Sequence, residues 1–191
     1  MAREVPRRVV HASGTVVPVL YLLEFLSWHQ IRMILAIGIS VALLIEAGRL
    51  VFDLQPPYID RLIRGYEEDY VAGYALYVIG GGSVGLLFEP AIAIPAILML
   101  TIGDPVAGLL GSGELRRVKQ PHVLAVMFVV SLSLAWWFLE PVAAIAAAAV
   151  ATLADGVKPV IKGYVIDDNL TIPIGAAFTA YLVTQYVLPL V

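Results

Sequence analysis

Three acidic motifs stand beside the most apolar runs of this chain, and their residue types suit chemistry on a phosphorylated ligand. The motifs are Gly103-Asp104-Pro105, Ala154-Asp155-Gly156 and Asp167-Asp168-Asn169, and the apolar runs cover 92–102, 141–153 and 170–191. A carboxylate at the centre of a membrane helix costs about 2.5–3.5 kcal/mol on insertion scales. Such residues normally persist because they bind something. The neighbouring glycines, proline and lysines suit a cation together with a phosphorylated ligand.

Asp104 is the strongest single candidate because of the residues on either side of it. Pro105 removes a backbone donor and disfavours helix in the residue before it, so we expect the helix to break or restart at Asp104. Exposed amides at a restarted helix can receive an anion, and the carboxylate can receive a metal ion. An N-cap is the alternative role of an Asp before Pro. Capping does not explain why a helix should restart between Leu100 and Leu109, so we favour a functional role.

The second and third motifs bracket one predicted loop that also carries Lys158 and Lys162. Mixed carboxylates and lysines on a single loop can hold Mg²⁺ and a polyphosphate together. Asn169 either reads the base or ribose of a nucleotide or caps the last helix. Capping is the stronger alternative for Asp168 and Asn169, because they stand directly before the last apolar run.

Basic residues near the N-terminus form a further candidate group. Arg7 and His11 are four residues apart and would share one face of a helix, with Arg8 beside them. Two guanidinium groups and an imidazole suit phosphate oxygens. The alternative is that the arginines anchor the first helix by their positive charge and that His11 is a hydrogen-bonded interfacial residue.

Two other groups of charged residues have weaker patterns. Glu46 and Arg49 lie three residues apart in one predicted helix, where they form either an intrahelical pair or an arm of the polar site. Residues 111–113 form a glycine-rich turn that is followed by three cations, Arg116, Arg117 and Lys119. This is the chemistry of a phosphate cradle without the spacing of a P-loop, and positive-inside bias alone would also produce it.

The elements that must position these residues are membrane helices. The chain has 191 residues, no cysteine, a hydrophobic share of 60% and a mean hydropathy of +0.89, whereas a soluble domain is about 45–50% apolar. The sequence predicts an all-α, polytopic membrane protein with one transmembrane domain over 1–191. Segment 56–69 predicts a short amphipathic helix on the membrane surface. With about 20 apolar residues needed per span, we expect seven helices, near 9–27, 33–52, 71–88, 90–111, 121–139, 140–157 and 170–191.

The basic residues fix the expected orientation. Of the 12 lysines and arginines, ten fall in alternate connecting segments, namely the N-terminus, 53–70, 112–120 and 155–169. Arg49 lies inside a predicted helix, and Arg32 lies in a connecting segment on the opposite side of the membrane. By the positive-inside rule, we expect a multi-pass protein of the cell membrane with a cytoplasmic N-terminus and an external C-terminus. The acidic motifs then lie at cytoplasmic helix ends.

These motifs, in this order, resemble the family of CTP-dependent lipid-alcohol kinases, which includes dolichol kinase, phytol kinase and the CTP-using diacylglycerol kinase. The resemblance runs from residue 7 to residue 173, and the short chain is similar to archaeal members. Family members usually have Ser after the lysine, where this chain has Gln120-Pro121-His122, and often have Glu before the Asp-Asn pair. The matching pieces are Arg7-Arg8-x-x-His11-x-x-Gly14, Glu46-x-x-Arg49, Gly103-Asp104-Pro105-x-Ala107-x-x-x-Gly111, Lys119 and Asp168-Asn169-Leu170-Thr171-Ile172-Pro173.

The resemblance implies a phosphotransferase that uses CTP and Mg²⁺ on a membrane-embedded polyprenol or dolichol-type alcohol. It implies catalytic roles for Asp104 and Asp155, and metal ligation by these two and Asp168. One carboxylate would accept the alcohol proton. We expect contact with the lipid bilayer and no nucleic-acid partner, and a homo-oligomer is compatible with the sequence. The residues it implies for nucleotide binding are Arg7, Arg8, His11, Glu46, Arg49, Lys119, Lys158, Asp168 and Asn169.

Two alternative functions stay open at this point. A lipid cytidylyltransferase would also use CTP, Mg²⁺ and a membrane lipid, but would attack the α-phosphate and release pyrophosphate. Its family typically carries a serine- and lysine-bearing signature that this chain lacks. A small transporter would place charges near the bilayer midplane within a repeated architecture, whereas here the charges lie at one rim and no repeat is visible.

Overall fold

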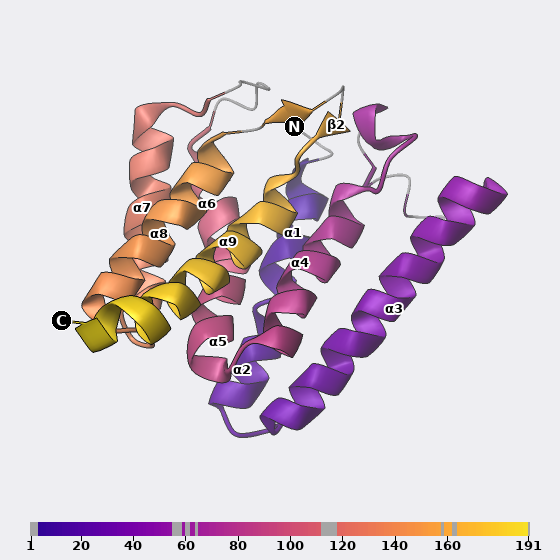
Figure 1. Ribbon diagram of the computed structural model, residues 1–191. Helices are drawn as coiled ribbons and strands as arrows, with labels where there is room; N and C mark the ends of the chain where they lie inside the picture. The colour runs from indigo at the N-terminus through magenta and orange to yellow at the C-terminus, as the bar shows by residue number, and fades with distance from the viewer. Residues whose placement is uncertain are drawn as a thin grey trace.

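The computed structural model describes residues 4–54, 59, 62–63, 65–111, 118–157, 159–161 and 164–190, with 4–8, 66, 160–161, 164–165 and 190 described by their backbone alone. This part of the chain is almost entirely helical (Figure 1), which confirms the all-α fold class. In chain order the helices are α1 (Glu4–Ser13), α2 (Val16–Leu22), α3 (Trp28–Phe52), α4 (Gly73–Leu87), α5 (Pro90–Leu98), α6 (Asp104–Leu109), α7 (Pro121–Ala135), α8 (Pro141–Gly156) and α9 (Asp168–Leu182).

Short elements complete the described part. Two π-helical turns follow α5 and α9, at Met99–Gly103 and Val183–Val187, and 3-10 turns cover Gly65–Glu67 and Leu188–Leu190. Strands β1 (Val160–Ile161) and β2 (Tyr164–Val165) form a small antiparallel hairpin between α8 and α9, which the sequence did not predict.

The surface helix predicted for 56–69 is wrong where it can be seen. The structure describes residues 59, 62–63 and 65–69 of this range, and they form no α-helix; the others lie outside the described residues. Arg49 explains part of the difference. Its guanidinium binds the backbone carbonyls of Glu68 and Tyr70, which draws these groups toward α3 rather than into a helix of their own.

Local signals explain where the helices begin. Pro90, Pro121 and Pro141 each begin a helix, because proline needs no hydrogen bond in the first turn. Ser27 caps α3 in a capping box with Gln30, so that helix starts ahead of its predicted boundary. The segment predicted as one helix over 9–27 is instead divided into α1 and α2. The division of 121–157 at Pro141 is confirmed.

Three helices in the described part are long and apolar enough to cross a membrane, namely Trp28–Phe52, Pro90–Leu109 and Asp168–Val187. Four shorter apolar stretches accompany them, over Val9–Leu22 (the end of α1 together with α2), Gly73–Leu87, Pro121–Ala135 and Pro141–Gly156. The membrane character expected from composition is therefore compatible with the fold.

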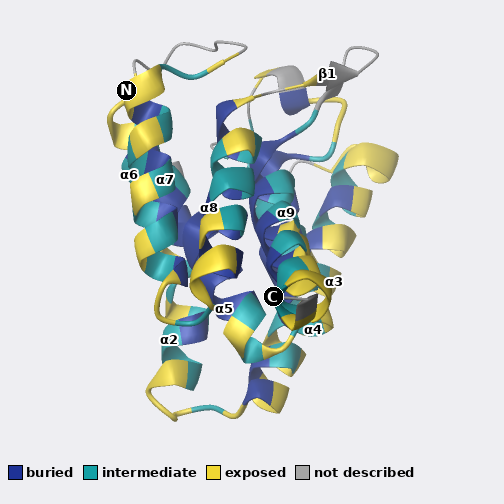
Figure 2. Ribbon diagram, turned by 60° about the vertical axis from the view of Figure 1, so that its left-hand side comes forward, coloured by how far each residue is buried: buried dark blue, intermediate teal, exposed yellow. Residues whose placement is uncertain are grey.

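The helices pack around α5, and α3 lies at one edge of the bundle (Figure 1). In the most apolar window of each, 67% of the Pro90–Leu109 residues are buried but only 11% of those in α3. Figure 2 shows the buried residues on the inward faces of α5, α8 and α9. Small residues allow the close approach: a Cβ added at Gly80 of α4 would lie 2.4 Å from the backbone oxygen of Asn169. This contact fixes the first turn of α9 beside α4, at the end where the acidic motifs meet.

Candidate functional site

Asp104 begins α6 directly after a π-helical turn, and Pro105 explains this irregularity. Proline has no N–H, and its ring clashes with the carbonyl four residues earlier, which here is that of Thr101. The π-turn widens the helix, and the N–H of Asp104 donates to the carbonyl of Met99. The predicted break or restart at Asp104 is wrong, because Pro90–Leu109 continues as one helix through the π-helical turn. The expectation that the Asp104 amide is open to an anion is wrong for the same reason, since the widened turn engages its N–H.

Three carboxylates from three helices converge. Asp104 stands at the start of α6, Asp155 at the end of α8 and Asp168 at the start of α9, and one oxygen of each lies within 4.8 Å of the others. Asp155 is 0% exposed and Asp168 is buried. Carboxylates this close repel one another, most strongly where water is excluded. The group therefore needs positive charge among its members.

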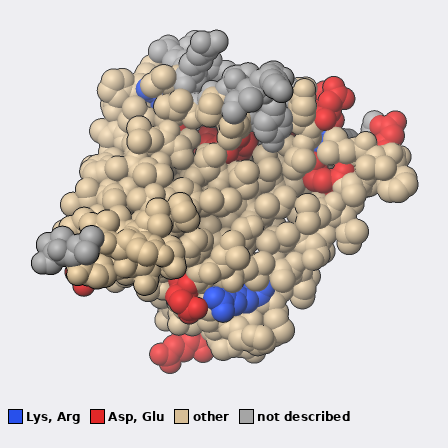
Figure 3. Space-filling model, in the orientation of Figure 1, with Lys and Arg blue, Asp and Glu red and all other residues tan. Residues whose placement is uncertain are grey.

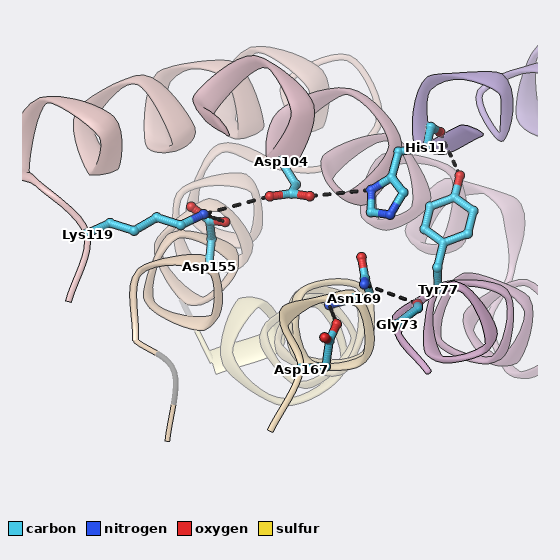
Figure 4. Close-up of polar contacts among 8 residues, drawn as sticks. All are labelled: His11, Gly73, Tyr77, Asp104, Lys119, Asp155, Asp167 and Asn169. Atoms are coloured by element: carbon cyan, nitrogen blue, oxygen red, sulfur yellow. Dashed lines mark hydrogen bonds and ion pairs between the residues drawn. The ribbon is translucent and has the colours of Figure 1, made fainter. Parts of the chain in front are cut away.

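Lys119 supplies one such charge. Its Nζ lies 2.5 Å from Oδ1 of Asp155 and 3.8 Å from Oδ1 of Asp104 (Figure 4). The backbone of this segment is tied to the end of α8: the N–H of Lys119 donates to the carbonyl of Gly156 at 3.0 Å, and Val118 pairs with Val157. One ammonium group does not balance three carboxylates.

The donor set fits a hard divalent cation. Mg²⁺ and Ca²⁺ take carboxylate and carbonyl oxygens as ligands. Within the acidic group, Oδ2 of Asp155 is buried and has no hydrogen-bond partner among the described residues. A buried acceptor left without a partner costs about 1–3 kcal/mol. A cation bound between the carboxylates would supply that partner and the missing charge.

His11 reaches the same site from α1. Its Nδ1 lies 3.4 Å from Oδ2 of Asp104, and its ring stacks on Tyr77 with centroids 4.4 Å apart. The Tyr77 hydroxyl donates to the backbone carbonyl of His11 at 2.7 Å. Gly14 makes room for this arrangement, because a Cβ there would lie 1.9 Å from the Tyr77 hydroxyl.

Tyr77 is a site residue that the sequence analysis missed. Its signal is its place on α4, four residues after Gly73 and three before Gly80, where it shares a helix face with two glycines that approach α9. A large aromatic residue between two small ones on a packed face indicates a position that fills a gap against a neighbouring helix.

The first turn of α9 assigns different roles to three consecutive polar residues. Asp167 is the N-cap, and its Oδ1 accepts from the N–H of Asn169 at 2.9 Å. The capping role that was the alternative for Asp168 and Asn169 falls on Asp167 instead, because the helix begins two residues earlier than expected. Asp168 joins Asp104 and Asp155 in the carboxylate group. The Asn169 amide nitrogen donates to the carbonyl of Gly73 at 3.2 Å.

Glu46 and Arg49 form a separate cluster where α3 meets the start of α4. Arg49 makes two hydrogen bonds to the Glu46 carboxylate, at 3.2 and 2.8 Å. The carboxylate also accepts from the N–H of Ala72 at 3.0 Å and from the hydroxyl of Tyr74 at 2.5 Å. The structure thus shows the intrahelical pair and does not bring it into the carboxylate site.

Several predicted residues lie outside what the structure describes. Arg7 and Arg8 are in α1, one turn before His11, but only their backbone is described. The loop cations Arg116, Arg117, Lys158 and Lys162 lie outside the described residues. Their nucleotide contacts stay predictions.

A comparison with models of protein families, with curated proteins and with solved structures finds no match to this chain.

Proposed function

We propose that this protein is a membrane-embedded kinase that transfers the γ-phosphoryl group of CTP to a long-chain isoprenoid alcohol. The observation that carries the proposal is the convergence of Asp104, Asp155 and Asp168 beside Lys119 and His11, at one end of a bundle that contains membrane-length helices. The choice of CTP and of an isoprenoid alcohol rests on the resemblance of the ordered motifs to lipid-alcohol kinases.

The site has the groups that phosphoryl transfer needs. This reaction depends on charge neutralisation and in-line positioning more than on covalent chemistry. Asp104, Asp155 and Asp168 would hold Mg²⁺, which when bound neutralises the charge of the β- and γ-phosphates. The ammonium of Lys119, held by Asp155, is placed to bind phosphate oxygens beside that position.

His11 is the best-placed proton acceptor. Its Nδ1 faces Oδ2 of Asp104 at 3.4 Å. In a neutral ring with the proton on Nδ1, Nε2 would be the acceptor nitrogen, and stacking on Tyr77 fixes the ring. In the proposed reaction the alcohol loses its proton to Nε2 as its oxygen forms a bond to the γ-phosphorus. The bond from that phosphorus to the bridging oxygen breaks, and CDP leaves. This assigns to His11 the proton transfer that the sequence analysis gave to a carboxylate.

We also propose seven spans with the site at the cytoplasmic face. Figure 3 shows charged side chains at the two ends of the visible face and an uncharged wall between them, as expected where hydrocarbon excludes charge. The chain has no cysteine, so cysteines introduced at Ala2 and Val191 report orientation directly. They should label from opposite sides of the membrane. Labelling from the same side would mean an even number of spans.

The test of function is turnover by purified protein with CTP labelled in either the α- or the γ-phosphate, Mg²⁺ and a panel of polyprenols. Lipid phosphate carrying the γ-label, together with CDP, supports the kinase. Pyrophosphate and α-labelled lipid would instead establish a cytidylyltransferase. Absence of turnover with every alcohol would refute both enzymes and favour a transporter or binding protein. ATP at the same concentration tests the choice of nucleotide, and Asp104→Asn serves as the inactive control.

A further inference from the structure

The side chain of Asn169 has a buried amide oxygen whose function neither the capping of α9 nor the carboxylate group explains. The residue is 2% exposed, and Oδ1 has no hydrogen-bond partner within the described part of the chain. Most buried polar side-chain atoms do have a partner. The exception calls for a physical reason.

The orientation of this amide is fixed by Gly73. The Asn169 nitrogen donates to the Gly73 carbonyl at 3.2 Å, and because a carbonyl only accepts, the amide oxygen cannot take that place. The backbone of Asn169 is equally constrained, since it packs directly on Gly80. Figure 4 shows the resulting direction: the Asn169 oxygen points away from Gly73, toward the side of the site where Asp104 and His11 lie.

Two buried oxygens of this site have no hydrogen-bond partner among the described residues, Oδ1 of Asn169 and Oδ2 of Asp155. Both are acceptors, so each needs a hydrogen-bond donor or a cation. Asp168, the residue before Asn169, already contributes an oxygen to the carboxylate group, so the first turn of α9 faces that position. Hard divalent cations bind neutral carbonyl oxygens together with carboxylates. One cation could therefore be bound by both oxygens.

We propose that Oδ1 of Asn169 is an uncharged fourth protein ligand of a divalent cation held by Asp104, Asp155 and Asp168. The inference rests on the metal-binding part of the proposed function, and not on the identity of the nucleotide or of the lipid. A neutral ligand adds an oxygen without a fourth negative charge. Three carboxylates, one ammonium from Lys119 and one divalent cation together leave this group without net charge.

The test is Mn²⁺ binding, followed by electron paramagnetic resonance, to purified protein without nucleotide or lipid. Asn169→Ala should weaken Mn²⁺ binding by at least about tenfold, since loss of a mere outer-shell partner already costs about 10–100-fold. Asn169→Asp keeps an oxygen at the position but loses the N–H donor to Gly73. It should keep the parent's affinity or exceed it.

The two variants separate ligation from support. If Asn169 only pins the Gly73 carbonyl, both variants lose affinity equally, and the proposal is overturned. Unchanged affinity in both would overturn it too, and would leave the oxygen to a donor group of the nucleotide or alcohol. Should Asn169→Ala fail to fold, Asn169→Asp still decides, because a tenfold loss there contradicts ligation.

Trp28→Phe is the matched control. The Trp28 indole N–H, at the start of α3, is also buried and has no hydrogen-bond partner among the described residues. It lies at the opposite end of the bundle (Figure 1), so its removal should change Mn²⁺ affinity by no more than about twofold. The parent must bind Mn²⁺, and Asp155→Asn must weaken that binding, or the proposal fails. A parent that binds Mn²⁺ through Asn169 but turns over no CTP would refute the proposed kinase and leave the ligand assignment standing.

Discussion

Glu46 on α3 and Asp155 on α8 are both buried carboxylates, but their oxygens have different partners. Glu46 accepts two hydrogen bonds from Arg49, one from the N–H of Ala72 and one from the Tyr74 hydroxyl. Asp155 accepts from Lys119 through Oδ1, while Oδ2 has no hydrogen-bond partner in the described structure. Glu46 is paired with the guanidinium of Arg49, whereas Asp155 lies within 4.8 Å of two other carboxylates.

The difference separates a structural cluster from a binding site. A carboxylate whose oxygens are all engaged has no capacity left for a ligand, and it ties together the elements that supply its donors. Here these are α3 and the segment that leads into α4. A carboxylate that is crowded by like charge and short of donors is costly in the protein alone. Such an arrangement is common where a protein is organised for a charged ligand.

Loss of a site carboxylate should give the largest effect. Asp104→Asn removes a proposed metal ligand and the partner of His11, and turnover should fall about 1000-fold, close to 4 kcal/mol of transition-state stabilisation. The midpoint of thermal unfolding without metal should stay equal or rise, because the variant relieves repulsion among three carboxylates. Turnover within about threefold of the parent, well under 1 kcal/mol, would remove Asp104 from the mechanism.

Glu46→Gln should show the reverse pattern. It takes from Arg49 the carboxylate that binds it, and removal of one partner of a largely buried pair costs about 3–5 kcal/mol of stability. We expect a large fall in the free energy of unfolding, and Mn²⁺ affinity of the remaining folded protein within about twofold of the parent. A much larger fall in Mn²⁺ affinity would mean that Glu46 and Arg49 are part of the binding site and do not form a separate structural cluster.

The sequence predicted the helical architecture well because hydrophobic runs and prolines act locally. Pro90, Pro121 and Pro141 begin helices as expected. The division between α1 and α2 could not be predicted from such local signals. It lies where Gly14 meets Tyr77 of α4, a contact between residues far apart in the chain.

The sequence predicted the charged residues of the site but not the residues that hold them in place. Asp104, Asp155 and Asp168 stood out because carboxylates are costly beside apolar runs, and the structure brings all three together. Tyr77 and Gly73 carry no such signal, since a tyrosine and a backbone carbonyl are ordinary in any helix. Which residue caps α9 depends on where the helix begins. The helix begins two residues before its predicted start, so Asp167 is the cap and Asp168 faces the other carboxylates.

Gly80→Ala should test how closely the site depends on the packing of α4 against α9. The new methyl group would lie 2.4 Å from the backbone oxygen of Asn169, which cannot move aside as a flexible side chain would. Overpacking of this kind costs about 1–3 kcal/mol, and the strain falls on the turn that presents Asp168 and Asn169. We expect both the unfolding free energy and Mn²⁺ affinity to fall.

Gly81→Ala is the control for that substitution. Gly81 is also buried on α4, but among the described residues its added Cβ would meet only the side chain of Leu100, at 3.7 Å, which is ordinary contact. It should leave Mn²⁺ affinity unchanged. Equal loss of affinity in the two variants would mean that any change in α4 disturbs the site, and that the Gly80 contact has no special role.

Tyr74 and Tyr77 offer the finest comparison, because they lie one turn apart on α4 and each serves a different cluster. Tyr74 donates to Glu46 at 2.5 Å, and Tyr77 donates to the backbone of His11 at 2.7 Å. Each Tyr→Phe change removes one hydroxyl and keeps the ring, for a cost of about 1 kcal/mol. In Tyr74→Phe that cost should appear in the free energy of unfolding, with turnover of the folded protein preserved.

In Tyr77→Phe the cost should appear in turnover, because the hydroxyl holds the backbone from which His11 reaches Asp104. A fall of about fivefold in kcat, with Mn²⁺ affinity unchanged, corresponds to about 1 kcal/mol. Tyr77→Leu, which also removes the stacked ring, should lower kcat further and leave Mn²⁺ affinity as it was. If Tyr77→Leu lowers Mn²⁺ affinity as much as kcat, then Tyr77 supports the whole carboxylate group. If instead kcat is unchanged in both Tyr77 variants, His11 does not depend on its stacking partner, and the proton acceptor must be sought among the carboxylates.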